Sequence, residues 1–384
     1  MSNSSLFLSR EVEVYINFDS KWWKVPVLDG FSFSQSTNTA EVTIKEMADT
    51  SNNSRRGRMM FNNSVSPAEF SFSTYARPVT IADSNATSVT RHHAIEEVCW
   101  AMMGLAGGTS YVDADKYWND PNTVQNNDDG ATVAFTASNK LTHSTPGQLY
   151  FHFPENDGQT AGDSGIWYQV KDAVINEAAM EFDIDGITTI GWSGMGTSLD
   201  EVAAPNDYTT REIADAVLTG TSSFIQNRLT QLTLSTADDH LLVDAGNAID
   251  AYSLVLTGGS ITITNNVEYT TPESLGVVNK PLGHTLGNRS VSGSFTCYLD
   301  HGSMASADLL ANLLGASSKI QNSFNTSFKV GGTTAPMLEV NVPKAHLEVP
   351  THSVEDVISM EISFHGLPSD ISSMDEINLK YVGA

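Results

Sequence analysis

Few residues of this sequence are grouped in a way that would support catalysis or metal binding. His92 and His93 are adjacent, so their side chains point to different sides and do not suit a shared metal ion. The segment 191–194 (Gly-Trp-Ser-Gly) lacks the spacing of a nucleophile elbow, and neither a phosphate-binding loop nor a His-Glu-x-x-His motif occurs. The acidic segments 128–130 and 183–186 resemble parts of calcium-binding loops but lack the full set of ligands. The sequence therefore predicts no catalytic residues, no cofactor and no metal site.

The cysteines, the first residues of the chain and the lengths of the apolar runs indicate where the protein is made. Cys99 and Cys297 each lie among apolar neighbours, and a disulfide framework needs more cysteines in a shorter chain. We therefore expect two buried free thiols. Residues 1–6 show no basic region followed by an apolar run, which predicts that there is no signal peptide. No run approaches the ~18 apolar residues that span a membrane, so the sequence predicts a protein made in a cytoplasm and without a membrane segment.

Acidic residues far outnumber basic ones. The 384 residues include 45 acids against 20 lysines and arginines, which gives a formal net charge of −25. Because binding to a phosphate backbone depends on lysine and arginine, this balance disfavours nucleic-acid binding. Two interpretations stay open: the charge maintains solubility, or it forms a surface that faces DNA closely without holding it.

Strand patterns dominate the chain, and helices are few. Residues 31–34, 41–46 and 70–75 alternate between apolar and polar, which is typical of strands with one buried face and one wet face. Further segments of strand-like composition lie at 13–18, 23–28, 167–170, 179–184 and 187–192. Apolar residues at helical spacing predict short helices over residues 92–104, 212–218 and 309–315.

The order of these elements occurs twice. Residues 252–264, 294–298 and 309–315 resemble residues 25–35, 71–75 and 98–104, respectively. Five positions then recur at one offset of 172 residues, namely Val170 and Val342, Ile175 and Leu347, Ile190 and Ile362, Trp192 and Phe364, and Gly194 and Gly366. We therefore expect a first domain at 1–204, with a polar insertion at about 105–150, a linker at 205–224, and a second domain at 225–384.

The repeated unit contains strands, a long loop, a strand, a helix and closing strands. A short helix cannot bury its apolar face alone, so it must lie on the sheet, which predicts a mainly-β or α+β sandwich. This order, together with residues 25–38, 66–78, 269–284 and 289–298, resembles the major tail tube proteins of bacteriophages. The resemblance implies two tandem β-sandwich or barrel domains, each with one flanking helix. Their strands would join those of neighbouring subunits into a large ring barrel, and closure would remove exposed sheet edges.

The resemblance also implies a structural function and a set of partners. Rings of this family usually hold six single tube domains, so two domains per chain imply homotrimeric rings of pseudo-six-fold symmetry, with homohexameric rings as the alternative. Stacked rings would form a tube in the virion, assembled in the host cytoplasm, and DNA would pass through the lumen without specific binding. Other partners would be a terminator, a baseplate or tip, and a sheath if the tail is contractile. The remaining alternatives are another virion β-protein, such as a terminator or decoration protein, and a carbohydrate-binding β-sandwich.

Two sets of residues are candidates for the surfaces that such a tube needs. Acids that alternate with apolar residues on predicted strands would give a repulsive wall toward DNA; they are Glu41, Glu181, Asp183, Glu339, Glu348 and Glu361. The loops at 48–63 and 271–289 occupy equivalent places in the two copies, and arginine suits carboxylates of an adjacent subunit. The candidates for ring stacking are Arg55, Arg56, Arg58, Asn279, Lys280 and Arg289. Ordinary solvated strands and loops are the alternatives for both sets.

Overall fold

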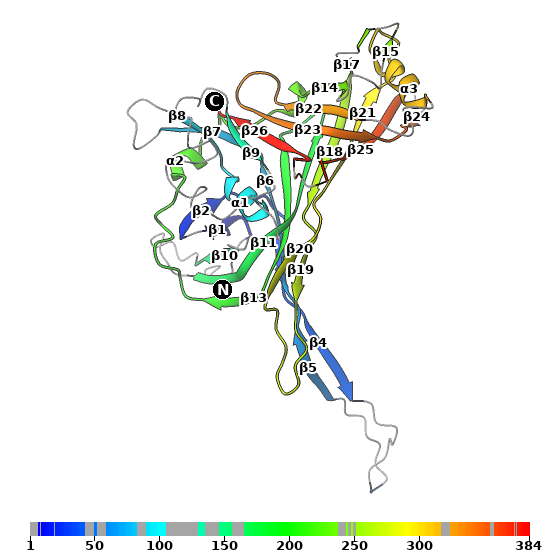
Figure 1. Cartoon of the computed structure of the whole chain (residues 1–384). Helices are drawn as coiled ribbons and strands as arrows, with labels where there is room; N and C mark the ends of the chain where they lie inside the picture. The colour runs from blue at the N-terminus through cyan, green and yellow to red at the C-terminus, as the bar shows by residue number, and fades with distance from the viewer. Residues whose placement is uncertain are drawn as a thin grey trace.

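The computed structural model is a mainly-β molecule in which long antiparallel strands dominate (Figure 1). It describes residues 7, 9–18, 20–42, 50–51, 59–82, 90–104, 130–134, 146–155, 165–236, 243–244, 247–248, 251–315, 323–353, 357–371, 373 and 375–384. The predicted mainly-β class is thereby confirmed.

One continuous antiparallel sheet forms the first layer. Its strands follow the order β3 (Ser32–Ser34), β6 (Ala68–Tyr75), β12 (Thr189–Gly196), the second half of β11 (Gly165–Asp183), β18 (Leu256–Thr264), β21 (Ser290–Tyr298) and β25 (Ser359–Gly366). The pairing between β11 and β18 joins the N-terminal half of the chain to the C-terminal half.

Two smaller groups of strands form the second layer, one from each half of the chain. The first group follows the order β2 (Lys21–Val25), β1 (Glu13–Phe18), β10 (Gly147–Pro154), the first half of β11, and β13 (Ser198–Val202). The second follows the order β17 (Tyr252–Ser253), β14 (Gln231–Thr236), β22 (Phe324–Val330), β23 (Met337–Leu347) and β26 (Asn378–Val382). Both groups therefore have the same antiparallel order.

Each half has one long strand that takes part in both layers. β11 pairs with β10 as far as Ala173, and from Val174 onward it pairs with β12. β23 pairs with β22 as far as Ala345 and with β25 over residues 345–347. The sequence predicted two separate strands at 167–170 and 179–184, which is wrong, because β11 is continuous across both. Lys171 pairs with Ser198, Ala173 with Gly147 and Val174 with Met195, so the strand continues through two register irregularities.

The apolar core lies between the layers and holds the helices. α1 (Glu97–Gly104) packs its Trp100 edge-on against Trp192 of β12, with ring centroids 4.7 Å apart. α3 (Ser306–Leu314) buries Leu309 and Leu313, and a short α2 (Asp215–Leu218), in the segment that connects the two halves of the chain, buries Leu218. Cys99 and Cys297 are both buried free thiols, as the sequence predicted.

The helix expected at 92–104 begins later than predicted. β8 (Thr90–Ala94) pairs with β7 (Pro78–Ala82) and contains His92 and His93. His93 Nδ1 lies 2.9 Å from Oε2 of Glu97 in α1, and His92 Nδ1 accepts a bond from the Gly383 amide. The apolar spacing therefore predicted the helix, but the pairing of β8 with β7 holds its first predicted turn as a strand.

The remaining strands form hairpins and edges. They are β4 (Thr37–Val42), β5 (Met59–Val65), β9 (Ala131–Ala134), β15 (Val243–Asp244), β16 (Asn247–Ala248), β19 (Val267–Thr270), β20 (Gly283–Leu286) and β24 (Thr351–Ser353), with 3₁₀ turns at Ser9–Glu11 and Asn227–Leu229. β9 comes from the predicted polar insertion, yet Ala131 and Val133 are buried and pair with β26. No helix in the described part of the chain is long and apolar enough to cross a membrane.

Candidate functional site

One face of the first layer is polar over its whole width, and we call it the polar face. The strands alternate, so that apolar residues such as Phe72, Ile261 and Phe295 enter the core and the residues between them point the other way. The side chains on the polar face are mainly small hydroxyls: Ser32, Ser34, Ser71, Ser73, Thr189, Ser193, Ser260, Thr262, Thr264, Ser290, Ser292, Ser294, Thr296, Ser359 and Ser363.

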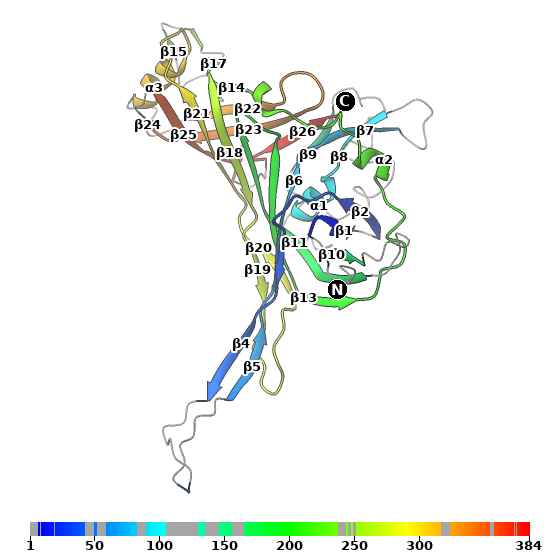
Figure 2. The ribbon, with the colours of Figure 1, turned by 180° about the vertical axis from the view of Figure 1, so that it is seen from behind.

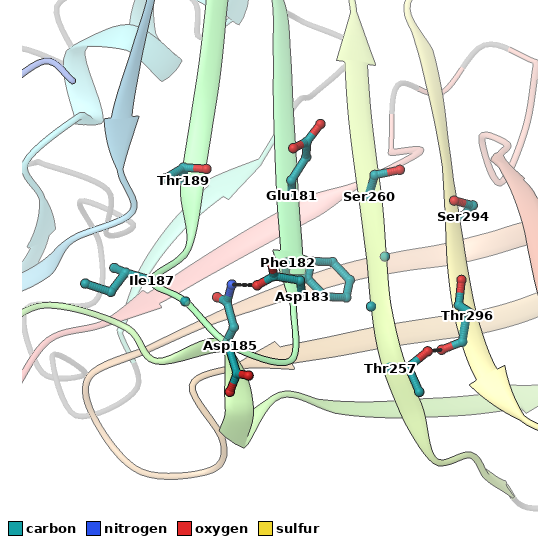
Figure 3. Close-up of a pocket in the computed structure, with 14 residues that line it drawn as sticks. Glu181, Phe182, Asp183, Asp185, Ile187, Thr189, Thr257, Ser260, Ser294 and Thr296 are labelled. Atoms are coloured by element: carbon teal, nitrogen blue, oxygen red, sulfur yellow. Dashed lines mark hydrogen bonds between the residues drawn. The ribbon is translucent and has the colours of Figure 1, made fainter. Parts of the chain in front are cut away.

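The strand registers align these side chains in rows across both halves of the chain. One row contains Tyr75, Thr189, Glu181, Ser260, Ser294 and Ser363. Figure 3 shows Thr189, Glu181, Ser260 and Ser294 of this row on four adjacent strands. The next row but one along the strands contains Ser71, Ser193, Glu177, Thr264 and Ser290. The face is thus one regular surface that crosses the junction between the halves.

The charge on the polar face is of one sign. It carries the acids Glu69, Glu177, Glu181, Asp183 and Glu361. None of the described strands that form it (β3, β6, β12, residues 174–183 of β11, β18, β21 and β25) contains a lysine or an arginine. A surface with acids and hydroxyls but without cations repels a polyanion and gives it no site to bind.

A hollow of about 530 Å³ interrupts this surface at the junction (Figure 3). Gly258 and Gly259 of β18 have no side chains there, and Glu181 and Asp183 of β11 line the hollow from the opposite strand. The Asn227 amide donates a 3.4 Å hydrogen bond to Asp183 Oδ1. In the described residues no group of three or more His, Cys, Asp or Glu side chains is arranged to hold a metal ion.

The structure places three of the six predicted lumen acids on the polar face over β11 and β25, and a fourth at its edge. Glu181, Asp183 and Glu361 belong to its rows. Glu348 follows β23 directly, and its Oε1 lies 3.1 Å from Nε2 of His365, which is on the polar face.

Glu339 and Glu41 lie elsewhere. Glu339 is on the part of β23 that belongs to the second layer, where its Oε1 accepts a bond from Ser327 and lies 3.9 Å from Lys329 Nζ. Lys380 of β26 is its neighbour in register. Glu41 is exposed on β4, outside both layers, and pairs in register with Met60.

Two hairpins extend away from one end of the sheet and form what we call the arm (Figures 1 and 2). The arm consists of β4, β5, β19, β20 and the loop at 271–282. β4–β5 precedes β6, and β19–β20 lies between β18 and β21, so both hairpins leave at the same end. Asn279 joins them: its carbonyl accepts the Val65 amide at 2.8 Å, and its own amide donates to the Asn63 carbonyl at 3.2 Å.

The arm exposes large apolar side chains. Met59, Met60 and Phe61 of β5 are 62%, 57% and 54% exposed, although they follow one another in a strand. The loop exposes Leu275, Val277, Val278 and Leu282 in the same way. A cluster of exposed apolar side chains on a projecting element is typical of an interaction surface.

The predicted stacking residues are distributed unevenly. Lys280 is exposed on the arm beside Asn279. Arg289 is buried at the base of the arm, where its Nε donates to Asn265 Oδ1 at 3.2 Å and its Nη1 lies 3.8 Å from Glu376 Oε2. Burial lowers the pKa of the Arg289 guanidinium, while Glu376 opposes that shift. Arg55, Arg56 and Arg58 lie outside the described residues.

Comparison with known proteins gives the family. A family model for the phage tail tube protein matches residues 46–366. The chain belongs to the phage tail tube protein family. Tail tube protein pb6 of Escherichia phage T5 is 28% identical to it over 367 residues, which span 92% of this chain and 69% of pb6.

Two solved phage-tail structures are more distant. The SPP1 tail tube matches 42% of this chain and 81% of its own, at 12% identity and a TM-score of 0.28. The tail of an empty GTA particle, refined with C6 symmetry, matches 40% of this chain and 95% of its own, at 11% identity and a TM-score of 0.26.

As a tail tube protein, the chain is a structural component of the virion, as the resemblance implied. Tail tube proteins assemble into stacked rings and tubes with other tail proteins, and the family is one of structural proteins. Two features of the tail tube chain escaped the sequence analysis. In the sequence, Met59–Phe61 resemble the beginning of an ordinary strand. The serines and threonines of the polar face were not among the predicted lumen residues, which were all acids. The absence of lysine and arginine from the predicted strands at 31–34, 70–75, 179–184 and 187–192 was a signal that could have indicated this face.

Proposed function

We propose that three copies of this chain form each ring of the tail tube, with the polar face toward the channel. The observation that carries this proposal is the repeated strand order. The first half pairs its strands as β3–β6–β12–β11, and the second half pairs them as β18–β21–β25–β23. The second layers repeat each other in the same way, which supports a duplicated tube domain.

Duplication makes three chains equivalent to six single domains. If the wall has six-fold pseudo-symmetry, two domains per chain require a trimer, whereas a homohexamer would place twelve domains in one ring. The junction between β11 and β18 supports the trimer, because it already joins two domains edge to edge in one sheet. The domain boundaries that we propose are residues 1–204 and 225–384, with residues 205–224 between them.

The polar face suits a channel wall. Its opposite side is occupied by the core, so this is the side of the layer that is free to face a lumen. DNA carries about one charge per 1.7 Å of its axis, so a cationic wall would retain it, while a wall of hydroxyls and acids lets it pass. Glu181, Asp183 and Glu361 contribute to this repulsion, with Glu348 at the edge, whereas Glu339 and Glu41 point to other surfaces.

The arm suits the contact between successive rings. It projects from one end of the sheet only, so rings that stack through it meet head to tail and form an open polymer. Met59, Met60 and Phe61 supply apolar area that becomes buried on contact, and Asn279 fixes the loop against β5. Lys280 and the arginines at 55, 56 and 58 would meet carboxylates of the acidic neighbour.

Electron microscopy of the purified chain at high concentration tests this proposal. We expect hollow stacked rings whose end views have three-fold symmetry, with a mass per ring of three chains. Rings built from six chains would refute the trimer but not the tube. A chain that remains a particle without rings, even when an assembled tail tip is added as an initiator, would contradict the proposed assembly as a whole.

A further inference from the structure

A buried polar cluster lies where the second half of the chain meets the helix of the first half, and we call it the joint. It consists of Arg77, Glu96, Trp100 and Tyr381, which are all buried. Glu96 directly precedes α1 and Trp100 belongs to α1, whereas Tyr381 belongs to β26, which pairs with β23 of the second half. The joint is therefore a contact between the halves in addition to the β11–β18 pairing.

The hydrogen bonds of the joint converge on one carboxyl group. Trp100 Nε1 donates to the Tyr381 hydroxyl oxygen at 2.8 Å, and the Tyr381 hydroxyl donates to the carboxyl group of Glu96. The Arg77 amide donates to the same group and lies 3.3 Å from both Oε1 and Oε2. Glu96 is thus the common acceptor that joins the start of α1 to β26 and to the chain that follows β6.

The side chain of Arg77 holds the linker between the halves. Its Nε donates to Ser223 Oγ at 3.0 Å, its Nη1 to the Leu218 carbonyl at 2.8 Å, and its Nη2 to the Gly220 carbonyl at 2.7 Å. The guanidinium therefore directs these donors to the linker, while only the backbone amide of Arg77 bonds to Glu96. The joint thus connects three parts of the chain: the first half, the linker and the second half.

The position of Glu96 makes this contact sensitive to protonation. Burial raises the pKa of Glu96 to about 7 from its ordinary 4.5, although the hydrogen bonds from Arg77 and Tyr381 oppose the shift. An ionised carboxylate without access to water costs free energy, and this cost is removed when the site opens. The titratable and charged groups around Glu96 are Arg77, Tyr381 of β26, Cys99 of α1, and the neighbouring pair Glu97 and His93.

We propose that the joint is a proton-controlled contact, which holds β26 of the second half against α1 while Glu96 is protonated and opens more readily once Glu96 is ionised. Opening separates Tyr381 from Trp100 and leaves the β11–β18 pairing in place. The two halves are therefore held together more tightly at acidic pH than at neutral pH. The role of the joint as a hinge between two tube domains of one ring rests on the proposed function.

The two native cysteines provide the test. Cys99 lies on α1 within the surroundings of Glu96, Cys297 lies on the central strand β21, and both are buried free thiols. Alkylation of the unassembled chain, followed by mass spectrometry of the two cysteine peptides, measures how often each thiol is exposed. Each rate is divided by that of a cysteine in an unstructured peptide at the same pH, which removes the titration of the thiol itself.

The expected change in the relative rate of Cys99 follows from the pKa of Glu96. In the closed joint Glu96 is about 10% ionised at pH 6 and about 90% ionised at pH 8, whereas an exposed Glu96 is ionised at both, so the equilibrium for opening should rise about tenfold. In Glu96→Gln, which keeps the shape of the side chain, the relative rate should not change with pH. Tyr381→Phe removes only the hydroxyl that links the halves and should raise the relative rate of Cys99 already at pH 6.

Comparison with Cys297 separates local opening from unfolding of the whole chain. We expect Cys99 to react faster than Cys297 and its rate to rise less steeply with urea, because a local opening exposes little surface. Equal rates and equal urea slopes for the two thiols would refute the joint, and the same pH dependence in Glu96→Gln would refute control by Glu96. Because the chain is unassembled in this experiment, either result leaves the proposed ring to be decided by electron microscopy.

Discussion

Removal of one apolar side chain from the arm should weaken ring stacking by an amount that the structure allows to be calculated. Phe61 is 54% exposed in the single chain. Burying a whole side chain of this kind contributes about 1.5–3 kcal/mol, so burying the exposed half contributes about 1 kcal/mol. A trimeric ring presents three arms to its neighbour, so Phe61→Ser should cost about 3 kcal/mol per ring junction. Because about 1.4 kcal/mol corresponds to a factor of ten, the critical concentration for tube growth should rise roughly 100-fold.

Sedimentation of tubes over a concentration series measures this critical concentration. Asn62→Ser is the matched control, because Asn62 is the exposed neighbour of Phe61 on β5 and carries no large apolar surface. The thermal unfolding midpoint of the monomer should stay unchanged in both variants, since Phe61 lies outside the core. A Phe61→Ser chain with the critical concentration of the control would refute the stacking role of the arm. A rise near 10⁴-fold would instead fit about six arms per junction.

Three further predictions concern the channel wall, a buried acid and a packed glycine. Glu181→Lys should leave tubes intact but make them retain a short DNA duplex at low salt and release it at high salt, as measured by co-sedimentation; tubes that retain none would contradict the channel assignment. Burial raises the pKa of Glu96 to about 7 from its ordinary 4.5, so the stability that its neutral form provides is complete below pH 4.5 and is lost as the pH rises through 7. The free energy of unfolding of Glu96→Gln, measured in urea at several pH values, should not fall in this way. The same dependence on pH in both chains would refute the role of Glu96. Gly194→Ala should lower the free energy of unfolding by about 1–3 kcal/mol, because its Cβ would lie 2.3 Å from the Val174 carbonyl, whereas Gly283→Ala meets nothing within 4 Å and should be neutral.

Local patterns in the sequence predicted the strands that have one wet face but not the layer to which each belongs. Alternation correctly marked Phe70–Tyr75 and Ile261–Thr264 as half-buried, because each faces the core on one side only. The same alternation marked Glu339 as pointing out of the core, yet it does not say out of which layer, and Glu339 lies beside Lys329 in the second one. The continuity of β11 could not be predicted either, since no local pattern shows that one strand passes from β10 in the second layer to β12 and β18 in the first.

The net charge, like the alternation of strands, indicated only part of the function. The excess of acids disfavoured nucleic-acid binding, but it pointed only to individual carboxylates. On the polar face the hydroxyls outnumber the acids, and the property that counts there is the absence of cations from the described strands. That property belongs to a surface assembled from seven strands, so it becomes visible only when the registers place Ser71, Glu181 and Ser294 on the same side.

Duplication within one chain has a physical consequence for the proposed ring. A strand at the edge of a sheet presents unpaired backbone groups that template pairing with other chains. A ring of six single domains would have to form six such contacts between separate chains, whereas in the trimer the covalently linked β11–β18 junction supplies three of them before assembly starts. The long strands β11 and β18 are already paired inside the molecule, so the register of this half of the contacts is set before assembly.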